Sequence, residues 1–193
     1  SALIADPLER IELARVNLHA GKKAMASTAF VSAQRYLKTG LDFLGGGDWV
    51  RAYDLTLALS LERAQCEHIN HRPEVARQYF GVSLEHAKTE LEKARIHLMQ
   101  LSLYGSQDDY RGAIEEGLAG LRCLGFNLSL RPHKLLILLE FLKEKWHRQG
   151  RAVKPLLDHL PQSEHPEHQL IFQLLSGIIP FASFESPGLN VMV

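Results

Sequence analysis

Apolar side chains recur at the three- and four-residue spacing of amphipathic helices along almost the whole chain. The first such pattern follows Asp6-Pro7, an N-cap residue and a first-turn proline, and extends to about Ala26. Pro180 is expected to kink or end the last one. No useful run shows the two-residue alternation of a strand. The pattern therefore predicts an all-α protein of about eight helices, the others lying near 28–44, 48–70, 73–84, 89–104, 108–124, 132–149 and 166–180.

Several of these helices begin at residues whose side chains can accept hydrogen bonds from free backbone N–H groups. Ser27 and Thr28 are predicted to cap the second helix, and Asp48 the third. Thr89 and Glu92 have the three-residue spacing of a capping box at the start of the fifth. These positions fix the expected helix starts independently of the apolar pattern.

Small residues recur at matching places in consecutive helix pairs. Gly21 with Ala33 and Ala64 with Ala76 have the same separation of twelve residues, and a looser third pattern ends on Ala113. Such spacing fits antiparallel helices whose backbones approach closely, and repeated hairpins of this kind stack into a solenoid. We expect three hairpins over residues 1–127 and further helical pairs of the same solenoid over 128–193.

Composition narrows the class of protein. The chain has 193 residues, 46% of them hydrophobic, and 22 basic against 22 acidic side chains. This neutral balance removes the main electrostatic argument for binding nucleic acid or an anionic membrane. Cys66 and Cys123 stand alone, which is typical of reduced thiols in the cytoplasm. No secretory leader is visible, and Glu140 interrupts the longest apolar run, so we expect a cytoplasmic protein without membrane insertion. Because the sequence starts without Met, we also expect that it was excised from a longer polypeptide.

The residues also resemble a known kind of protein region. The run S-x-A-F-x-x-A-x-x-Y-L-x-x-G at 27–40 is followed by W-x-x-x-Y-x-L-x-L-x-L at 49–59 and by L-x-x-L-G-F at 121–126. Together they resemble the tetratricopeptide-like helical region of very large bacterial signalling proteins, which combine serine/threonine-kinase-like, AAA ATPase, GAF and sensor histidine kinase domains. The resemblance covers nearly the whole chain. It departs from a generic tetratricopeptide pattern because the repeats are unequal and Leu101 stands where the third needs a small residue.

Candidate metal ligands are few. Cys66, His68 and His71 lie close together, but zinc needs four ligands and no second pair is near in sequence. His165 and His168 flank a helix start without the H-E-x-x-H pattern of a metalloprotease. We therefore expect no metal site, with solvated or helix-end histidines as the interpretation of both groups.

Other chemical signals are equally incomplete. Gly45, Gly46 and Gly47 lack the Lys-Ser/Thr and the preceding strand of a phosphate-binding loop, so they are interpreted as a helix-breaking turn. His86, His97 and His147 lack the dimeric two-helix signature of a phospho-accepting histidine. The sequence predicts no catalytic residue and no cofactor.

With no catalytic or metal site predicted, protein–protein interaction is the function that the sequence favours. We expect a non-catalytic protein-interaction scaffold and regulatory linker, with other domains of the same polypeptide and a protein or peptide as partners, and a homodimer left open. A stand-alone peptide-binding adaptor and the repeat region of an NTPase-type transcription activator are the alternatives, and a helical metal-dependent hydrolase ranks last. The candidate interaction residues are the aromatic side chains Trp49, Tyr53, Tyr79, Tyr104 and Trp146, although aromatics at helical spacing more often fill the core between hairpins.

Overall fold

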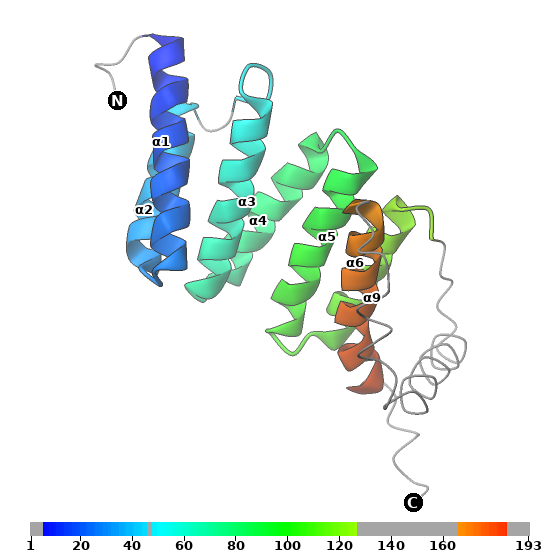
Figure 1. The fold of residues 1–193 in the computed structure, drawn as a ribbon. Helices are drawn as coiled ribbons and strands as arrows, with labels where there is room; N and C mark the ends of the chain where they lie inside the picture. The colour runs from blue at the N-terminus through cyan, green and yellow to red at the C-terminus, as the bar shows by residue number, and fades with distance from the viewer. Residues whose placement is uncertain (1–5, 46–47, 127–165, 185–193) are drawn as a thin grey trace, which may run out of the picture. The chain divides into compact units, whose positions relative to one another are not determined.

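The computed structural model describes residues 6–45, 48–126 and 166–184, which contain seven α-helices and no strand (Figure 1). The all-α prediction is confirmed. The number of described helices is seven rather than about eight, because the helix expected at 132–149 lies outside the described residues. The helices are α1 (Pro7–Ala26), α2 (Phe30–Phe43), α3 (Tyr53–Ile69), α4 (Pro73–His86), α5 (Glu90–Gly105), α6 (Tyr110–Cys123) and α9 (Pro166–Phe184).

The chain divides into two compact units, residues 1–88 and 89–193, each with an apolar core. The first contains α1 to α4, and the second contains α5, α6 and α9. The predicted division into three hairpins over 1–127 and further pairs over 128–193 stays a prediction, because residues 127–165 lie outside the described part.

Helices α1 and α5 begin where local chemistry predicts. The carboxylate of Asp6 accepts a hydrogen bond from the Leu8 amide at 3.0 Å, and Pro7 occupies the first turn. At α5 the Thr89 hydroxyl accepts from the Glu92 amide at 3.1 Å, and the Glu92 carboxylate accepts from the Thr89 amide at 3.0 Å. The predicted capping box is therefore confirmed.

The predicted start of α2 is wrong by two residues. Thr28 has a φ of 57°, and its amide donates to the Met25 carbonyl, so it closes α1 instead of opening α2. The Ser27 hydroxyl likewise donates back to the Lys23 carbonyl at 3.0 Å. Helix α2 then begins at Phe30 with no side-chain cap, because its N-cap residue is Ala29 and the Ser27 and Thr28 hydroxyls donate to backbone carbonyls before it.

The predicted start of α3 at Asp48 is also wrong. The Asp48 carboxylate accepts from the Arg51 amide at 3.0 Å and therefore caps a separate turn. The helix begins at Tyr53, and the Thr56 hydroxyl ties its first turn to the Asp48 carbonyl at 3.0 Å. At the other end of the chain, α9 continues past Pro180 to Phe184.

In the first unit α1 and α2 run in opposite directions. A side chain at Gly40 would meet Asn17, whereas one at Gly21 would meet Leu37. A later residue of α1 therefore lies beside an earlier residue of α2. The nearest side chain to Gly21 is Leu37, one turn beyond the Ala33 that the sequence pattern suggested. Buried apolar residues of α1 to α3 form the core: Ala14, Ala33, Leu37, Leu41, Leu44, Leu55, Leu59 and Cys66.

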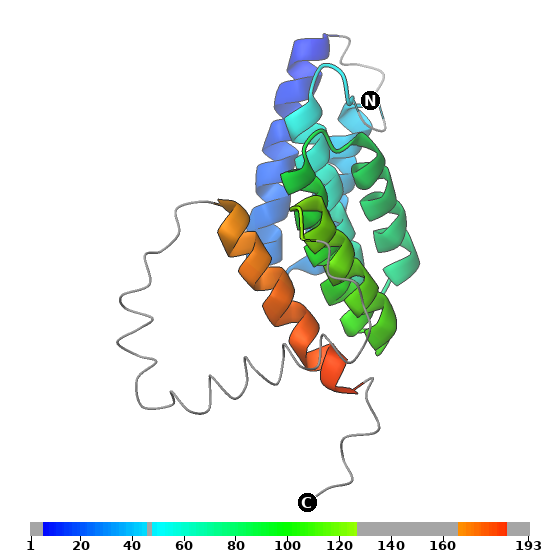
Figure 2. The same ribbon diagram turned by 90° about the vertical axis from the view of Figure 1, so that its right-hand side faces the viewer.

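In the second unit α9 packs on α5 and α6, as both ribbon views show (Figures 1 and 2). Its apolar side chains lie directly against glycines of the other two helices, with Leu174 beside Gly120 and Ile178 beside Gly117. This close approach buries a second core made of Ala94, Leu101, Ala113, Ile114, Leu118, Leu121, Leu170, Leu174 and Ile178.

Candidate functional site

Trp49, the first of the predicted interaction residues, packs against the end of α4. Its ring stacks on the imidazole of His86, with centroids 4.3 Å apart and planes 13° apart. Tyr53 lies at 6.0 Å from Trp49 in a tilted arrangement. The Nδ1 atom of His86 is 2.9 Å from the Val82 carbonyl oxygen, which fixes the ring on its helix. The stacking of Trp49 on His86 therefore packs the turn before α3 against the end of α4.

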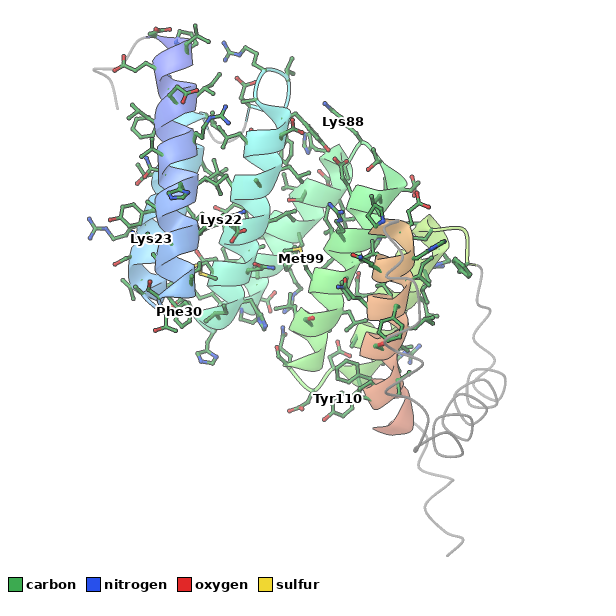
Figure 3. The ribbon with its side chains drawn as sticks, in the orientation of Figure 1. Lys22, Lys23, Phe30, Lys88, Met99 and Tyr110 are labelled. Atoms are coloured by element: carbon green, nitrogen blue, oxygen red, sulfur yellow. The ribbon has the colours of Figure 1, made fainter. Side chains whose placement is uncertain are left out.

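Tyr53 is engaged on both its ring and its hydroxyl group. Only 9% of its surface is exposed, and its hydroxyl oxygen accepts a hydrogen bond from the Lys88 amide at 3.1 Å. The Lys88 ammonium, labelled in Figure 3, lies 3.6 Å from the ring centroid, a cation–π contact. Tyr53 therefore holds the residues after α4 in place.

The structure brings together only part of the predicted aromatic set. Tyr79 packs against the core of the first unit, with the Arg63 guanidinium 5.9 Å from its ring centroid. Tyr104 packs against the core of the second unit, and Trp146 lies outside the described residues. Trp49 and Tyr53 are thus neighbours, while a surface shared by all five residues stays a prediction.

A buried ionic cluster, absent from the sequence prediction, joins α2 and α3. The Glu67 carboxylate is 1% exposed and pairs with the Arg63 guanidinium one turn earlier. It also accepts from the Gln34 side-chain amide at 3.0 Å, and Arg63 donates to the Gln34 carbonyl. The i,i+4 spacing of opposite charges was readable in the sequence, but it is also the spacing of ordinary exposed pairs.

The metal candidates Cys66, His68 and His71 do not form a site. Cys66 is buried, with its sulfur 3.4 Å from the Phe30 carbonyl oxygen. Burial, and secondarily the nearby His71, lower the pKa of His68. Within the described ranges no three His, Cys, Asp or Glu side chains gather closely enough to hold a metal ion.

Both cysteines are expected to react slowly with iodoacetamide in the folded chain. Burial is the main cause that raises the pKa of the Cys66 and Cys123 thiols, so at pH 8 each carries less thiolate than free cysteine. Mass spectrometry should find Cys66 unmodified until urea unfolds the chain, with Cys123 modified more slowly than a free thiol. A Cys123→Ser variant isolates Cys66. Rapid labelling of Cys66 in that folded variant would contradict its placement.

Pockets open at the surface of the described part of the first unit. A pocket of about 150 Å³ lies at one end of α1 and α2, but its arginines are already engaged. Arg10 donates to the Phe43 carbonyl at 2.8 Å, and Arg51 pairs with Asp48 at 2.7 Å.

The second pocket, of about 250 Å³, lies between α1 and α2 and has a polar lining. We call it the α1–α2 pocket; it is lined by Asn17, Ser32, Arg35, Tyr36 and Thr39. These residues were not singled out from the sequence.

None of the described helices is long and apolar enough to cross a membrane. Comparison with family models finds no match, and no solved structure matches the chain. A curated protein described as "Hybrid signal transduction histidine kinase G", from Dictyostelium discoideum, is 23% identical over 167 residues. The similarity covers 82% of this chain and 5% of that protein, so the chain spans about one twentieth of its relative's length. The chain is therefore distantly similar to one stretch of a signalling histidine kinase.

Proposed function

We propose that this chain is a non-catalytic helical-repeat region of a signal-transduction ATPase/kinase, acting as an interaction scaffold and regulatory linker between catalytic modules. The observation that carries the proposal is the unequal coverage of the similarity. Most of this chain matches a small part of a histidine kinase, at 82% of the chain against 5% of the kinase. A segment that occupies so little of such a protein is one module among several.

The packing supports a tetratricopeptide-like solenoid as the form of this region. Leu59 of α3 lies against Gly40 of α2, and Leu174 of α9 lies against Gly120 of α6. In each unit a helix therefore docks on the preceding pair at a small residue seven positions after a buried alanine. The docking positions are Gly40, seven residues after Ala33, and Gly120, seven after Ala113; Ser83 stands at the same distance after Ala76 in α4, and all six residues are buried.

The proposed mechanism is mechanical. Hairpins that contact only their neighbours let a small rotation at each interface add up along the array. A partner that binds one curvature better than another shifts the population toward it and so biases the attached catalytic domains. The chain would contribute shape and binding surface, while the chemistry would belong to the other modules.

The isolated chain is expected to incorporate no phosphate from labelled ATP and to hydrolyse none, whereas the full-length protein encoded by its gene does so. Deleting residues 6–126 from that protein should retain nucleotide hydrolysis but abolish its response to the activating partner. The complete reading frame comes first, because the proposal requires kinase-like or NTPase modules beside this segment. A frame that encodes this segment alone would favour the adaptor alternative, and turnover by the isolated chain would refute the non-catalytic role.

A further inference from the structure

The α1–α2 pocket has a lining with unused hydrogen-bonding capacity. The side chains of Ser32, Arg35, Tyr36 and Thr39 have no hydrogen-bond or ion-pair partner within the described residues. Asn17 donates its side-chain amide to the Leu13 carbonyl at 2.8 Å, which leaves its own carbonyl oxygen available. The pocket therefore presents three hydroxyl groups and a guanidinium to an incoming group.

The positive charge of the pocket lining favours an anionic ligand. Arg35 is the charged side chain among the five lining residues, and none of the five is acidic. The other pocket differs, because Arg51 there is neutralised by Asp48 and Arg10 is bound to backbone carbonyls. An uncompensated guanidinium beside hydroxyl donors is suited to charge-assisted hydrogen bonds.

The donors also share one stripe of α2. Ser32, Arg35, Tyr36 and Thr39 follow the i, i+3, i+4, i+7 spacing, so their side chains lie on the same face. A phosphate monoester offers three terminal oxygens and a charge of about −1.5 to −2, whereas a carboxylate offers two oxygens. At roughly 30 Å³ per water molecule, the pocket's volume of about 250 Å³ has room for the phosphate and its attached side chain.

The corresponding face of α4 shows that this chemistry is specific to the first helix pair. Ala33 and Ala76 are both buried and stand 43 positions apart. The same offset replaces Ser32 by Val75, Arg35 by Gln78 and Thr39 by Val82, and it aligns Tyr36 with Tyr79. Tyr79 packs against the core of the first unit, whereas Tyr36 is 44% exposed. Tyr79 is thus the position of this α4 face that packs against the core, while Gln78 and Val82 stay exposed, and the α4 face lacks the arginine and the hydroxyl groups of Ser32 and Thr39.

We propose that the α1–α2 pocket binds a phosphate monoester presented by a phosphorylated side chain of a protein partner, with Arg35 as the anchoring residue. The proposal goes beyond the placement of this chain in a kinase, because it concerns binding by residues 1–193 alone. It stands or falls independently of which modules the gene encodes.

Amide chemical shifts of the ¹⁵N-labelled chain provide the test. A short phosphoserine peptide should produce saturating shifts at residues 32–39, and its unphosphorylated form none. Arg35→Gln should weaken binding by about 10- to 100-fold, the range expected for losing a hydrogen bond to a charged group. Lys38→Gln removes the same charge from another exposed residue of α2, one that does not line the pocket, and should change affinity less than about twofold.

Four outcomes would overturn the proposal. These are the absence of saturation, equal losses in the Arg35 and Lys38 variants, equal binding of a glutamate peptide, and binding of inorganic phosphate or free phosphoserine as tightly as the peptide. The last would assign the pocket to a free ligand. Circular dichroism of the Arg35 variant checks that its helices are intact, which is expected because Arg35 is exposed.

Discussion

Replacing Arg63 by methionine is expected to lower the free energy of unfolding by about 3–5 kcal/mol, the usual cost of leaving one member of a buried ion pair without its partner. Glu67 is 1% exposed, so water cannot solvate the carboxylate that remains. The Gln34 amide would stay at 3.0 Å, but the nearest other cation, on Arg72, is 3.9 Å away and largely exposed. Urea denaturation followed by helical circular dichroism measures the loss.

Two variants decide whether the buried charge is the cause. The double change Arg63→Met with Glu67→Leu removes both charges and should restore most of the lost stability, because apolar replacement of a buried pair is often neutral or stabilising. Arg15→Met breaks an exposed pair with Glu12 on α1 and should cost less than about 1 kcal/mol. If the double variant is no more stable than Arg63→Met alone, lost packing rather than an unpaired charge explains the effect.

The sequence predicted helix starts where neighbouring residues alone determine them. Asp6-Pro7 and the Thr89–Glu92 box act within one turn, so both were recognised. Thr28 and Asp48 were misassigned because each has a cap-forming side chain that serves a different turn. Which of two adjacent turns receives such a side chain depends on the path of the backbone.

The candidate surfaces were less predictable because they depend on which helix face is covered. The four α2 residues of the pocket form a readable stripe, but the sequence does not show which faces of α2 are covered by α1 and α3. Trp49 and Tyr53 were selected as aromatics, whereas their partners His86 and Lys88 lie more than 30 residues away. Arg63 and Glu67 resembled an ordinary surface pair because burial of i,i+4 charges leaves no periodic signal.

The same substitution, glycine to alanine, is expected to have opposite effects at two helical sites. A methyl group at Gly117 of α6 would lie 2.7 Å from Ile178 Cδ1 and 2.8 Å from Leu101 Cδ1. Both neighbours are 3% exposed, so moving either side chain would disturb the surrounding core. Overpacking of this kind costs about 1–3 kcal/mol, more than alanine's helix preference recovers, so we expect a net loss of roughly 1–2 kcal/mol.

Gly81 of α4 is the matched control, because a methyl group there would have no neighbour within 4 Å. Gly81→Ala should therefore stabilise the chain by about 0.5–1 kcal/mol through helix preference alone. Combining Gly117→Ala with Ile178→Val should cost less than the sum of the two single changes, because the smaller side chain relieves the crowding. Urea denaturation of the four variants measures these differences. Equal stabilisation by alanine at both glycines would contradict the close packing of α9 on α6, and with it the docking of a helix at a small residue on which the repeat assignment depends.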